Sequence, residues 1–252
     1  MKKITSIASQ KGGTGKTTTS ISISAGLARL YNKRVLLVDM DSQANSSKVL
    51  LPDYLQLKKE ETTFASILDR KPLPIRPTNT PNLDVCPSHI LLSETDVRLT
   101  TALDHREARL KQQLDKVKHN YDFVFIDCPP ALSWLTLNAF TASDQVLVVL
   151  SPGYFELDSI VQLNRSVAQT QENFNPNLEL LGYLFTMSDS TLNSSVSLEI
   201  IRQNYPSTTF KNIIPRNTTL RDAHFKHTDI FEYDPTSKGA EAYKRLIEEV
   251  FI

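Results

Sequence analysis

The chain has 252 residues, of which 40% are hydrophobic and 22% charged, so it can bury a large core as one domain. Lysine plus arginine number 28, as do aspartate plus glutamate, so overall charge gives no indication of a polyanionic partner. No apolar run approaches the roughly 20 residues that a membrane span needs. We therefore expect a single domain over residues 1–252, cytoplasmic and without a membrane partner, in which any nucleic-acid surface is a local patch.

Apolar runs alternate with amphipathic stretches along the chain. The apolarity of these runs is continuous, which indicates strands covered on both faces. We expect an α/β fold with a doubly wound, mostly parallel sheet, in which ligands lie at the carboxyl ends of the strands. A proline-rich stretch, 70–82, is expected to be a surface loop. The predicted strands are 4–8, 34–38, 123–126, 146–150 and 178–185, and the predicted helices are 17–30, 106–117, 155–168 and 238–250.

The glycine-rich segment QKGGTGKTTTS, 10–20, follows the first predicted strand and leads into the first predicted helix. Its glycines let the backbone approach a phosphate, so that N–H groups and the helix N-terminus can hold the anion. Lys16 would reach the outer phosphates, and the Thr17 hydroxyl would ligate Mg²⁺. The alternative is a glycine-rich turn without a ligand, but the strand-loop-helix context favours a phosphate loop. The predicted nucleotide-binding residues here are Gly12, Gly13, Thr14, Gly15, Lys16, Thr17 and Thr18.

This loop departs from the usual phosphate-loop pattern at its start. Gln10 stands where the pattern has its first glycine, and a second lysine, Lys11, follows it. The extra lysine needs a role, because one lysine is enough to reach the phosphates of a bound nucleotide.

Carboxylates follow two of the predicted strands. Asp127 closes the strand in YDFVFIDCPP, where a phosphate-loop enzyme places the carboxylate that holds Mg²⁺ through its water shell. Asp39 and Asp41 end the strand after the first helix, so we expect them beside the loop, with both side chains able to face the phosphates. Taken alone, Asp127 would be better interpreted as a turn-forming residue at the end of a strand. Together with the loop, these aspartates predict a magnesium site.

Four segments in this order, KGGTGKTT, VLLVDMDSQAN, FVFIDCPP and IIPRNTTLRDA, resemble the ParA/Soj/MinD family of deviant Walker-type ATPases, and within it the short ParA form. The resemblance covers essentially the full chain. It implies the P-loop NTPase fold of the SIMIBI-like type, with ATP and Mg²⁺ as cofactors. It also implies an ATPase that is slow and is stimulated by a partner.

The resemblance assigns roles to the loop and its carboxylates. In this family two ATP-bound subunits pack face to face, which implies that Lys11 reaches the nucleotide of the other subunit of a homodimer. Asp41 would position or activate the attacking water, while Asp39 and Asp127 would support the magnesium shell with Thr17. For Lys11 the alternative is an ordinary solvated loop lysine. An adenine pocket is implied near Thr186, Met187, Pro215, Arg216 and Asn217.

ATP dimers of this family also bind DNA without sequence preference, through basic residues in the C-terminal third. The stretch 201–227 contains five lysines and arginines against one acid, and Arg202, Arg221 and Lys226 are the predicted DNA contacts. Where many relatives carry arginine, this chain has Thr219, and Arg221 is the expected substitute. A solvated face of mixed charge is the alternative.

The implied function is the positioning or segregation of a cargo along the nucleoid. The cargo would be a plasmid, a chromosome or a protein body such as a carboxysome, and a ParB-like or other cargo-adaptor protein would stimulate hydrolysis. One rival is a MinD-like membrane-associated division-site regulator, but 237–252 is expected to be joined too closely to the core to act as an anchor. A metal or redox carrier ATPase would use Cys86 and Cys128, which we expect to be buried small hydrophobes instead.

Overall fold

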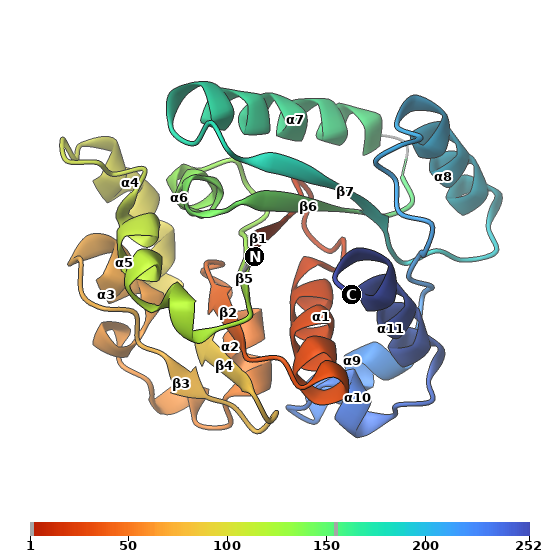
Figure 1. Ribbon diagram of the computed structural model, residues 1–252, viewed down its shortest axis with the longest axis horizontal. Helices are drawn as coiled ribbons and strands as arrows, with labels where there is room; N and C mark the ends of the chain where they lie inside the picture. Colours follow the sequence, from red (N-terminus) through yellow and green to blue (C-terminus); the bar gives the residue numbers. More distant parts are fainter. Residues whose placement is uncertain (1–2, 154–155) are drawn as a thin grey trace.

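The computed structural model of the chain describes residues 3–153 and 156–252. Within these residues, seven strands form one sheet in the order β3-β4-β2-β5-β1-β6-β7 (Figure 1). Every neighbouring pair is parallel except β3 and β4, which are antiparallel. The expected mostly parallel sheet is confirmed. The strands are β1 (Lys3–Ala8), β2 (Val35–Asp39), β3 (Arg76–Pro77), β4 (Leu83–Cys86), β5 (Phe123–Asp127), β6 (Gln145–Leu150) and β7 (Glu179–Phe185).

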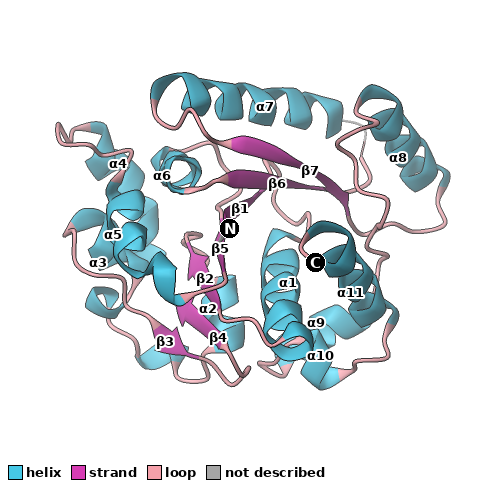
Figure 2. Cartoon of the chain, viewed as in Figure 1, coloured by secondary structure: helices cyan, strands magenta, loops and turns pink. Residues whose placement is uncertain are grey.

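Helices cover the sheet on both sides, as Figure 2 shows. One set lies beside α1 and includes α9, α10 and α11, while α5, α6 and α7 cover the opposite face (Figure 1). The helices are α1 (Lys16–Tyr31), α2 (Asn45–Leu50), α3 (Thr63–Leu68), α4 (Thr95–Thr100), α5 (Arg109–Val117), α6 (Trp134–Ala142), α7 (Glu156–Asn173), α8 (Leu192–Asn204), α9 (Thr218–Phe225), α10 (Ile230–Tyr233) and α11 (Lys238–Val250).

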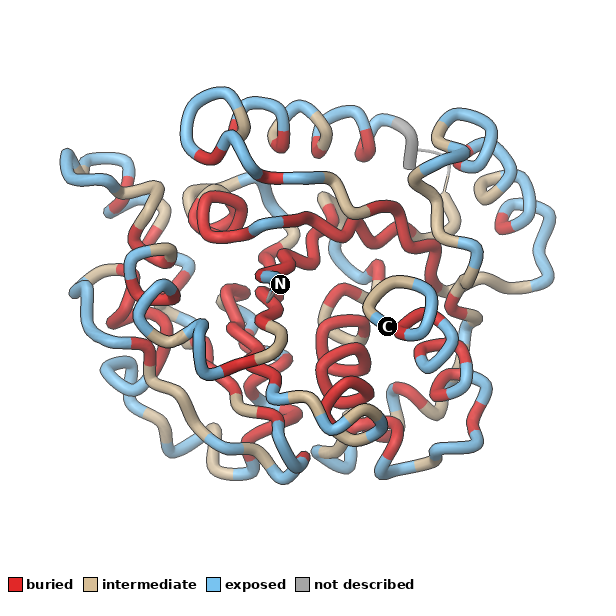
Figure 3. Tube along the Cα trace, in the orientation of Figure 1, coloured by how far each residue is buried: buried red, intermediate tan, exposed pale blue. Residues whose placement is uncertain are grey.

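The strands divide their side chains between two cores. In β2, Leu36 and Val38 pack into the core shared with α5 and α6, whereas Val35 and Leu37 pack into the core shared with α1 and α11. Successive side chains of a strand point to opposite faces, so a strand buried on both sides must be apolar throughout. The buried tube segments in Figure 3 follow this arrangement, since most of the central strands and the inward faces of the helices are red.

Three segments differ from the sequence prediction. The expected helix over 106–117 begins only at Arg109, because the Arg106 carbonyl accepts a hydrogen bond from Asn138 Nδ2 rather than from a following helical turn. The expected loop over 70–82 contains the edge strand β3, which pairs with β4 through Arg76 and Pro77. The helix predicted over 155–168 extends to Asn173, and its first predicted residue lies outside the described residues.

The order of the strands shows how Asp39 and Asp41 come to lie near the loop. Strand β2 does not neighbour β1, because β5 lies between them. Asp39 is instead in register with Asp127 of β5, which is in register with Ile7 of β1. The two strand-terminal carboxylates therefore lie side by side at one edge of the sheet, next to the loop that follows β1.

The helices of the described residues include none that combines the length and the apolarity needed to cross a membrane. The last helix, α11, packs against α1 and buries Leu246 and Ile247 in the core.

Candidate functional site

The loop between β1 and α1 presents bare backbone to an open space. Gly13 and Gly15 have φ values of 78° and 87°, a left-handed conformation that other residues adopt at a cost. A Cβ atom added at Gly12 or Gly13 would meet no atom within 4 Å. Backbone N–H groups at this position can therefore approach an anion closely, as a phosphate-binding loop requires.

Thr14, inside the same loop, has a buried hydroxyl that no other described residue satisfies. Its carbonyl accepts a hydrogen bond of 2.6 Å from the Thr186 hydroxyl, which ties the loop to the end of β7. Its own Oγ1 has no hydrogen-bond partner among the described residues. An unsatisfied buried polar group costs about 1–3 kcal/mol. A ligand oxygen or a magnesium-bound water at the loop would supply the missing partner.

Lys16 is the buried cation of the site. Its side chain is buried, and Nζ donates a hydrogen bond of 3.3 Å to the Lys11 carbonyl, so it folds back over the loop. Burial lowers the pKa of Lys16, and the nearby carboxylates of Asp127 and Asp41 oppose this shift. The ammonium group is thus already largely removed from water, so it can bind phosphate oxygens without losing a full hydration shell.

Three short hydroxyl side chains hold the carboxylate of Asp127. Ser20 and Ser46 donate hydrogen bonds of 3.1 and 2.7 Å to its two oxygens, and Thr17 donates a third. Thr17 and Ser20 belong to α1, whereas Ser46 belongs to α2. Asp127 therefore joins the helix after the loop to the helix after β2, and Thr17 lies beside the carboxylate with which we expect it to share a magnesium ion.

Asp39 is held in the same manner by the first turn of α2. The backbone N–H and the hydroxyl of Ser47 donate to its Oδ2 at 2.9 and 2.6 Å, and the Asp41 N–H donates to Oδ1 at 3.1 Å. Sequence reasoning missed Ser46 and Ser47, although both stand in the segment DMDSQANSS that drew attention to the aspartates. The sequence shows two serines shortly after Asp41. It does not show that the chain turns back and brings their hydroxyls onto the carboxylates of Asp127 and Asp39.

Burial raises the pKa of both Asp39 and Asp127. The negative charge of Asp127 raises the pKa of Asp39 further, to about 8. Two buried carboxylates this close repel each other, so a divalent cation would favour the ionised form of both. The available donors are oxygens, which Mg²⁺ prefers. Thr17, Asp39 and Asp127 fit a magnesium ion through two carboxylates and a hydroxyl. Within the described residues, no group of three or more His, Cys, Asp and Glu side chains is placed to hold a metal.

Asp41 differs from the other two aspartates. It is slightly exposed, and its Oδ1 accepts only the Gln43 N–H, at 2.9 Å, among the described residues. Its backbone makes the buried contacts. The Asp41 N–H donates a hydrogen bond to the Asp39 carboxylate, and the Asp41 carbonyl accepts one of 2.6 Å from the Ser88 hydroxyl. The backbone therefore holds the residue in place, which leaves the carboxylate available to a water molecule.

A pocket of about 410 Å³ adjoins the loop on the side of α9. It contains all five residues of the predicted adenine pocket. Two backbone hydrogen bonds, Ser188 N–H to the Ile214 carbonyl and Arg216 N–H to the Ser188 carbonyl, join the segments that carry them. The lining residues are Gly15, Thr18, Thr186, Met187, Ile214, Pro215, Arg216, Asn217, Thr218, Leu220, Arg221, His224 and Tyr243.

Arg221, which was predicted to contact DNA, lines the same pocket. Arg221 lies on α9 with Asn217, Leu220 and His224, at the spacing of one helix face. Sequence reasoning counted the arginine as part of a basic stretch and missed His224 altogether. The helical spacing of these four residues was the available signal.

The other predicted DNA contacts lie apart from each other. Arg202 is on α8, where its guanidinium donates to the Lys211 carbonyl at 3.3 Å, and Lys226 is the residue that ends α9. Both side chains are exposed. Helices α8 and α9 occupy different parts of the molecule (Figure 1), so the structure does not gather Arg202, Arg221 and Lys226 into one compact cluster.

Both cysteines are fully buried, as expected. Burial raises the pKa of Cys128 to about 12 and that of Cys86 further still, so both remain thiols at neutral pH. Thiols of this kind behave as small hydrophobic side chains.

Comparison with known proteins connects this site to ATP. Residues 2–180 match the family model described as AAA domain. The chain is 40% identical over 253 residues to the sporulation initiation inhibitor protein Soj of Bacillus subtilis, covering 99% of this chain and 98% of the relative. It is 37% identical to the chromosome partitioning protein ParA of Myxococcus xanthus, covering 98% of this chain and 87% of the relative.

A solved structure extends the comparison to a bound ligand. Cobyrinic acid a,c-diamide synthase from Mycobacterium smegmatis, with an ATP analogue and magnesium bound, superimposes with a TM-score of 0.82. The two chains are 32% identical, and the match covers 98% of this chain and 93% of the other.

Proposed function

Because this chain belongs to the ParA/Soj family of ATPases, we propose that it positions or segregates a cargo by ATP-dependent dimerisation on DNA. The chain uses ATP with Mg²⁺. Binding of ATP makes the face-to-face dimer, the dimer binds DNA without sequence preference, and a cargo-bound adaptor stimulates an otherwise slow hydrolysis. Hydrolysis then releases the protein from DNA close to the cargo.

The observation that carries this proposal is the construction of the phosphate end of the site. Open glycine backbone, a buried lysine and two buried carboxylates held by α1 and α2 meet at one edge of the sheet. Burying charged groups together lowers the stability of the folded protein. A magnesium nucleotide would offset this cost, because its phosphates would face the lysine and its cation would face the carboxylates. In the proposed site Lys16 holds phosphate, Thr17, Asp39 and Asp127 hold magnesium, and Asp41 positions the attacking water.

The proposed dimer depends on Lys11. Lys11 is half-buried beside the exposed Gly12 and Gly13, at the open rim of the loop. If a second subunit faced this rim, the Lys11 ammonium group would reach the triphosphate that is bound to the second subunit. A cation in a water-poor interface stabilises the charge that develops on the transferred phosphoryl group. This is the role we propose for the extra lysine.

The proposed DNA surface and cargo rest on the relatives rather than on a single feature of the chain. A protein named for chromosome partitioning is 37% identical over nearly the whole length. Lys226 and Arg202 offer exposed positive charge, and a dimer would present each of them twice, which strengthens weak contacts. A chromosome, a plasmid and a protein body remain the proposed cargo classes, with a ParB-like or other adaptor as the partner.

Sedimentation with DNA and, separately, with anionic liposomes tests the proposal, each in the presence of ATP or ADP. We expect the protein to sediment with an unrelated DNA duplex in ATP, to remain in solution in ADP, and to ignore liposomes. Light scattering should show a dimer in ATP, and Lys11→Ala should bind ATP yet stay monomeric. DNA binding that does not depend on the nucleotide would contradict the proposed DNA-bound ATP dimer, and ATP-dependent liposome binding would contradict the absence of a membrane partner. Normal dimerisation of Lys11→Ala would contradict the role proposed for Lys11.

A further inference from the structure

The stretch that carries Asp39 and Asp41 lies beside the segment that follows β4. Strands β2 and β4 are parallel neighbours, with Val38 in register with Cys86, so both strands end at the same edge of the sheet (Figure 1). The segment after β4 is therefore placed to contact the backbone that leads from β2 into the site.

Ser88, in the segment after β4, uses both of its polar groups on this neighbouring stretch. Its hydroxyl donates a hydrogen bond of 2.6 Å to the Asp41 carbonyl. Its N–H donates one of 2.8 Å to the hydroxyl of Ser47, which in turn donates to the Asp39 carboxylate. Ser88 is fully buried, so water does not compete for these hydrogen bonds. One residue thus connects the proposed water-positioning residue to a proposed magnesium carboxylate.

The Ser88 hydroxyl ties Asp41 to a different part of the chain. The other hydrogen bonds of Asp41 join it to residues of its own stretch, 39–44, such as Gln43 and Ala44, whose N–H groups donate to it at 2.9 Å each. Hydrogen bonds within a turn preserve the shape of the turn, but they move with it. Among the described residues, the Ser88 hydroxyl is the one donor outside this stretch that hydrogen-bonds Asp41.

Thr63, the first residue of α3, secures the start of the same stretch. Its hydroxyl donates to the Asp39 carbonyl at 3.1 Å, and its N–H donates to the Pro87 carbonyl at 2.8 Å. Thr63 is fully buried, as Ser88 is. One hydroxyl from α3 and one from the segment after β4 therefore fix the backbone of residues 39–41.

The placement of a water-positioning carboxylate matters more for hydrolysis than for nucleotide binding. The attacking water must be aligned with the phosphoryl group, and a displacement of about 1 Å can slow a reaction about a hundredfold. In the proposed site the phosphates and magnesium are bound by other groups, among them Lys16, Thr17 and Asp127. Loosening the backbone of Asp41 should therefore lower the hydrolysis rate and leave the ATP affinity unchanged.

We propose that Ser88 is a positioning residue for ATP hydrolysis, and that its hydroxyl fixes the Asp41 carboxylate relative to the magnesium carboxylates. Thr63 supports the same backbone. This inference rests on the proposed function, because it depends on Asp41 as the residue that positions the attacking water. Ser88 and Thr63 do not contact the nucleotide in this arrangement, since both act through the backbone of residues 39–41.

Ser88→Ala removes the donor to the Asp41 carbonyl and retains the N–H that binds Ser47. We expect hydrolysis of bound ATP in a single turnover to slow about tenfold. The ATP affinity, measured by calorimetry, and the ATP dimer, measured by light scattering, should stay as in the wild type. The matched control is Ser66→Ala, because Ser66 is also fully buried and donates to a backbone carbonyl, that of Pro72, at 3.1 Å. This control should hydrolyse ATP at the wild-type rate.

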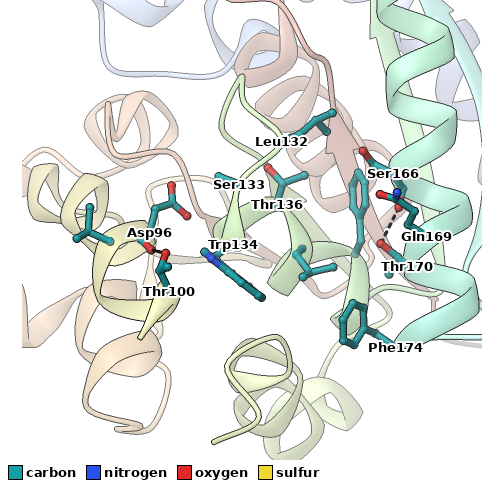
Figure 4. A pocket seen from close by; sticks show the side chains of 13 residues that line it. Asp96, Thr100, Leu132, Ser133, Trp134, Thr136, Ser166, Gln169, Thr170 and Phe174 are labelled. Atoms are coloured by element: carbon teal, nitrogen blue, oxygen red, sulfur yellow. Dashed lines mark hydrogen bonds between the residues drawn. The ribbon is translucent and has the colours of Figure 1, made fainter. Parts of the chain in front are cut away.

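Thr63→Val is a second test that keeps the shape of the side chain, and it decides the matter if Ser88→Ala does not fold. It removes the hydroxyl that binds the Asp39 carbonyl, so hydrolysis should slow about threefold at unchanged ATP affinity. Its control is Thr170→Val on α7. Thr170 is buried too and donates to the Ser166 carbonyl at 2.8 Å, beside a groove that shares no lining residue with the nucleotide pocket (Figure 4). Hydrolysis should be unchanged in this control.

Combining Ser88→Ala with Asp41→Ala shows whether Ser88 acts through the carboxylate. The double variant should hydrolyse ATP as slowly as Asp41→Ala alone, because no carboxylate remains to be placed. Two residues that act independently would multiply their effects, and the double variant would then be about tenfold slower than Asp41→Ala.

The inference is wrong if Ser88→Ala hydrolyses ATP as Ser66→Ala does, if the ATP affinity falls together with the rate, or if the double variant is slower than Asp41→Ala. A slow Asp41→Ala beside a normal Ser88→Ala would contradict this inference alone. Wild-type hydrolysis by Asp41→Ala would contradict the role of Asp41 in the proposed function, and this inference with it, so the two failures are distinguishable. Equal rates in Thr63→Val and Thr170→Val would show that Thr63 has no part in positioning Asp41.

Discussion

The phosphate end of the site and the basic region of α8 and α9 are built in opposite ways. At the phosphate end, Lys16, Asp39 and Asp127 are buried. The two carboxylates accept hydrogen bonds from α1 and α2, and Lys16 donates one to the Lys11 carbonyl. In the basic region Arg202 and Lys226 are exposed, on separate helices. Buried charges must be matched by neighbours, so each of them depends on the others, whereas exposed charges act almost independently. Substitutions should therefore have large, specific effects in the first region and small, additive ones in the second.

The largest effect is expected from Lys16→Ala, which removes the buried cation from the loop. Loss of its charge-assisted contacts to phosphate should weaken ATP binding by about 4 kcal/mol, or roughly a thousandfold. Isothermal titration calorimetry with ATP and Mg²⁺ measures this directly. Lys118→Ala, at an exposed lysine paired with Asp115, is the control and should bind ATP normally. Near-normal affinity in Lys16→Ala would remove the loop from nucleotide binding.

Asp41→Ala should separate hydrolysis from binding. The buried contacts of this residue are made by its backbone, so alanine retains them, and loss of a carboxylate that positions water should slow hydrolysis about a hundredfold or more. We expect ATP binding to persist and the ATP dimer to accumulate, measured by single-turnover hydrolysis and light scattering. Hydrolysis at the wild-type rate would assign the water to another residue.

The third prediction concerns His224 in the wall of the nucleotide pocket. The expected effect lies between those of the buried phosphate end and the exposed basic region. Burial lowers the pKa of His224 from 6.5 to about 4, so the folded protein binds a proton there less readily than the unfolded chain. Stability from this residue is complete above pH 6.5 and is lost as the pH falls toward 4, by about 2 kcal/mol in the free energy of unfolding.

Urea unfolding at pH 7 and pH 4.5 measures this effect. His224→Gln should lose less stability over that interval than the wild type, while His119→Gln, at an exposed histidine, should behave as the wild type does. An identical loss in His224→Gln and wild type would show that the histidine does not titrate in this manner.

The smallest effects are expected from Arg221 of α9 and from Lys226, which directly follows α9; both were predicted to contact DNA. Arg221→Ala should weaken ATP binding about threefold, because Arg221 lines the nucleotide pocket. Lys226→Ala should leave ATP binding unchanged, lower affinity equally on all DNA sequences and reduce the salt slope of DNA binding by about one unit.

The pair is compared by fluorescence anisotropy on an unrelated duplex across a salt series, together with calorimetry for ATP. If Arg221→Ala affects DNA alone, as Lys226→Ala should, then the arginine belongs to the DNA surface despite its place in the pocket wall.

The local structures of this protein could be predicted from the amino-acid sequence alone. The phosphate loop is a local structure, because Gly12, Gly13 and Gly15 impose its backbone and Lys16 opens the helix that follows. The strands were recognisable for a related reason, since β2 and β5 are covered on both faces and are therefore apolar up to the aspartate that ends each of them. The last predicted helix, 238–250, has the observed bounds of α11.

Only the tertiary structure decided how these local pieces meet. The strand order placed β5 between β1 and β2, which put Asp39 beside Asp127 and brought Ser46 and Ser47 back onto both carboxylates. The tertiary structure also made Arg221 part of the nucleotide-pocket wall, while Arg202 lies on another helix, α8. A hydrogen bond between residues 81 positions apart leaves no periodicity in the sequence, and the direction of an exposed side chain depends on packing that local residues do not set.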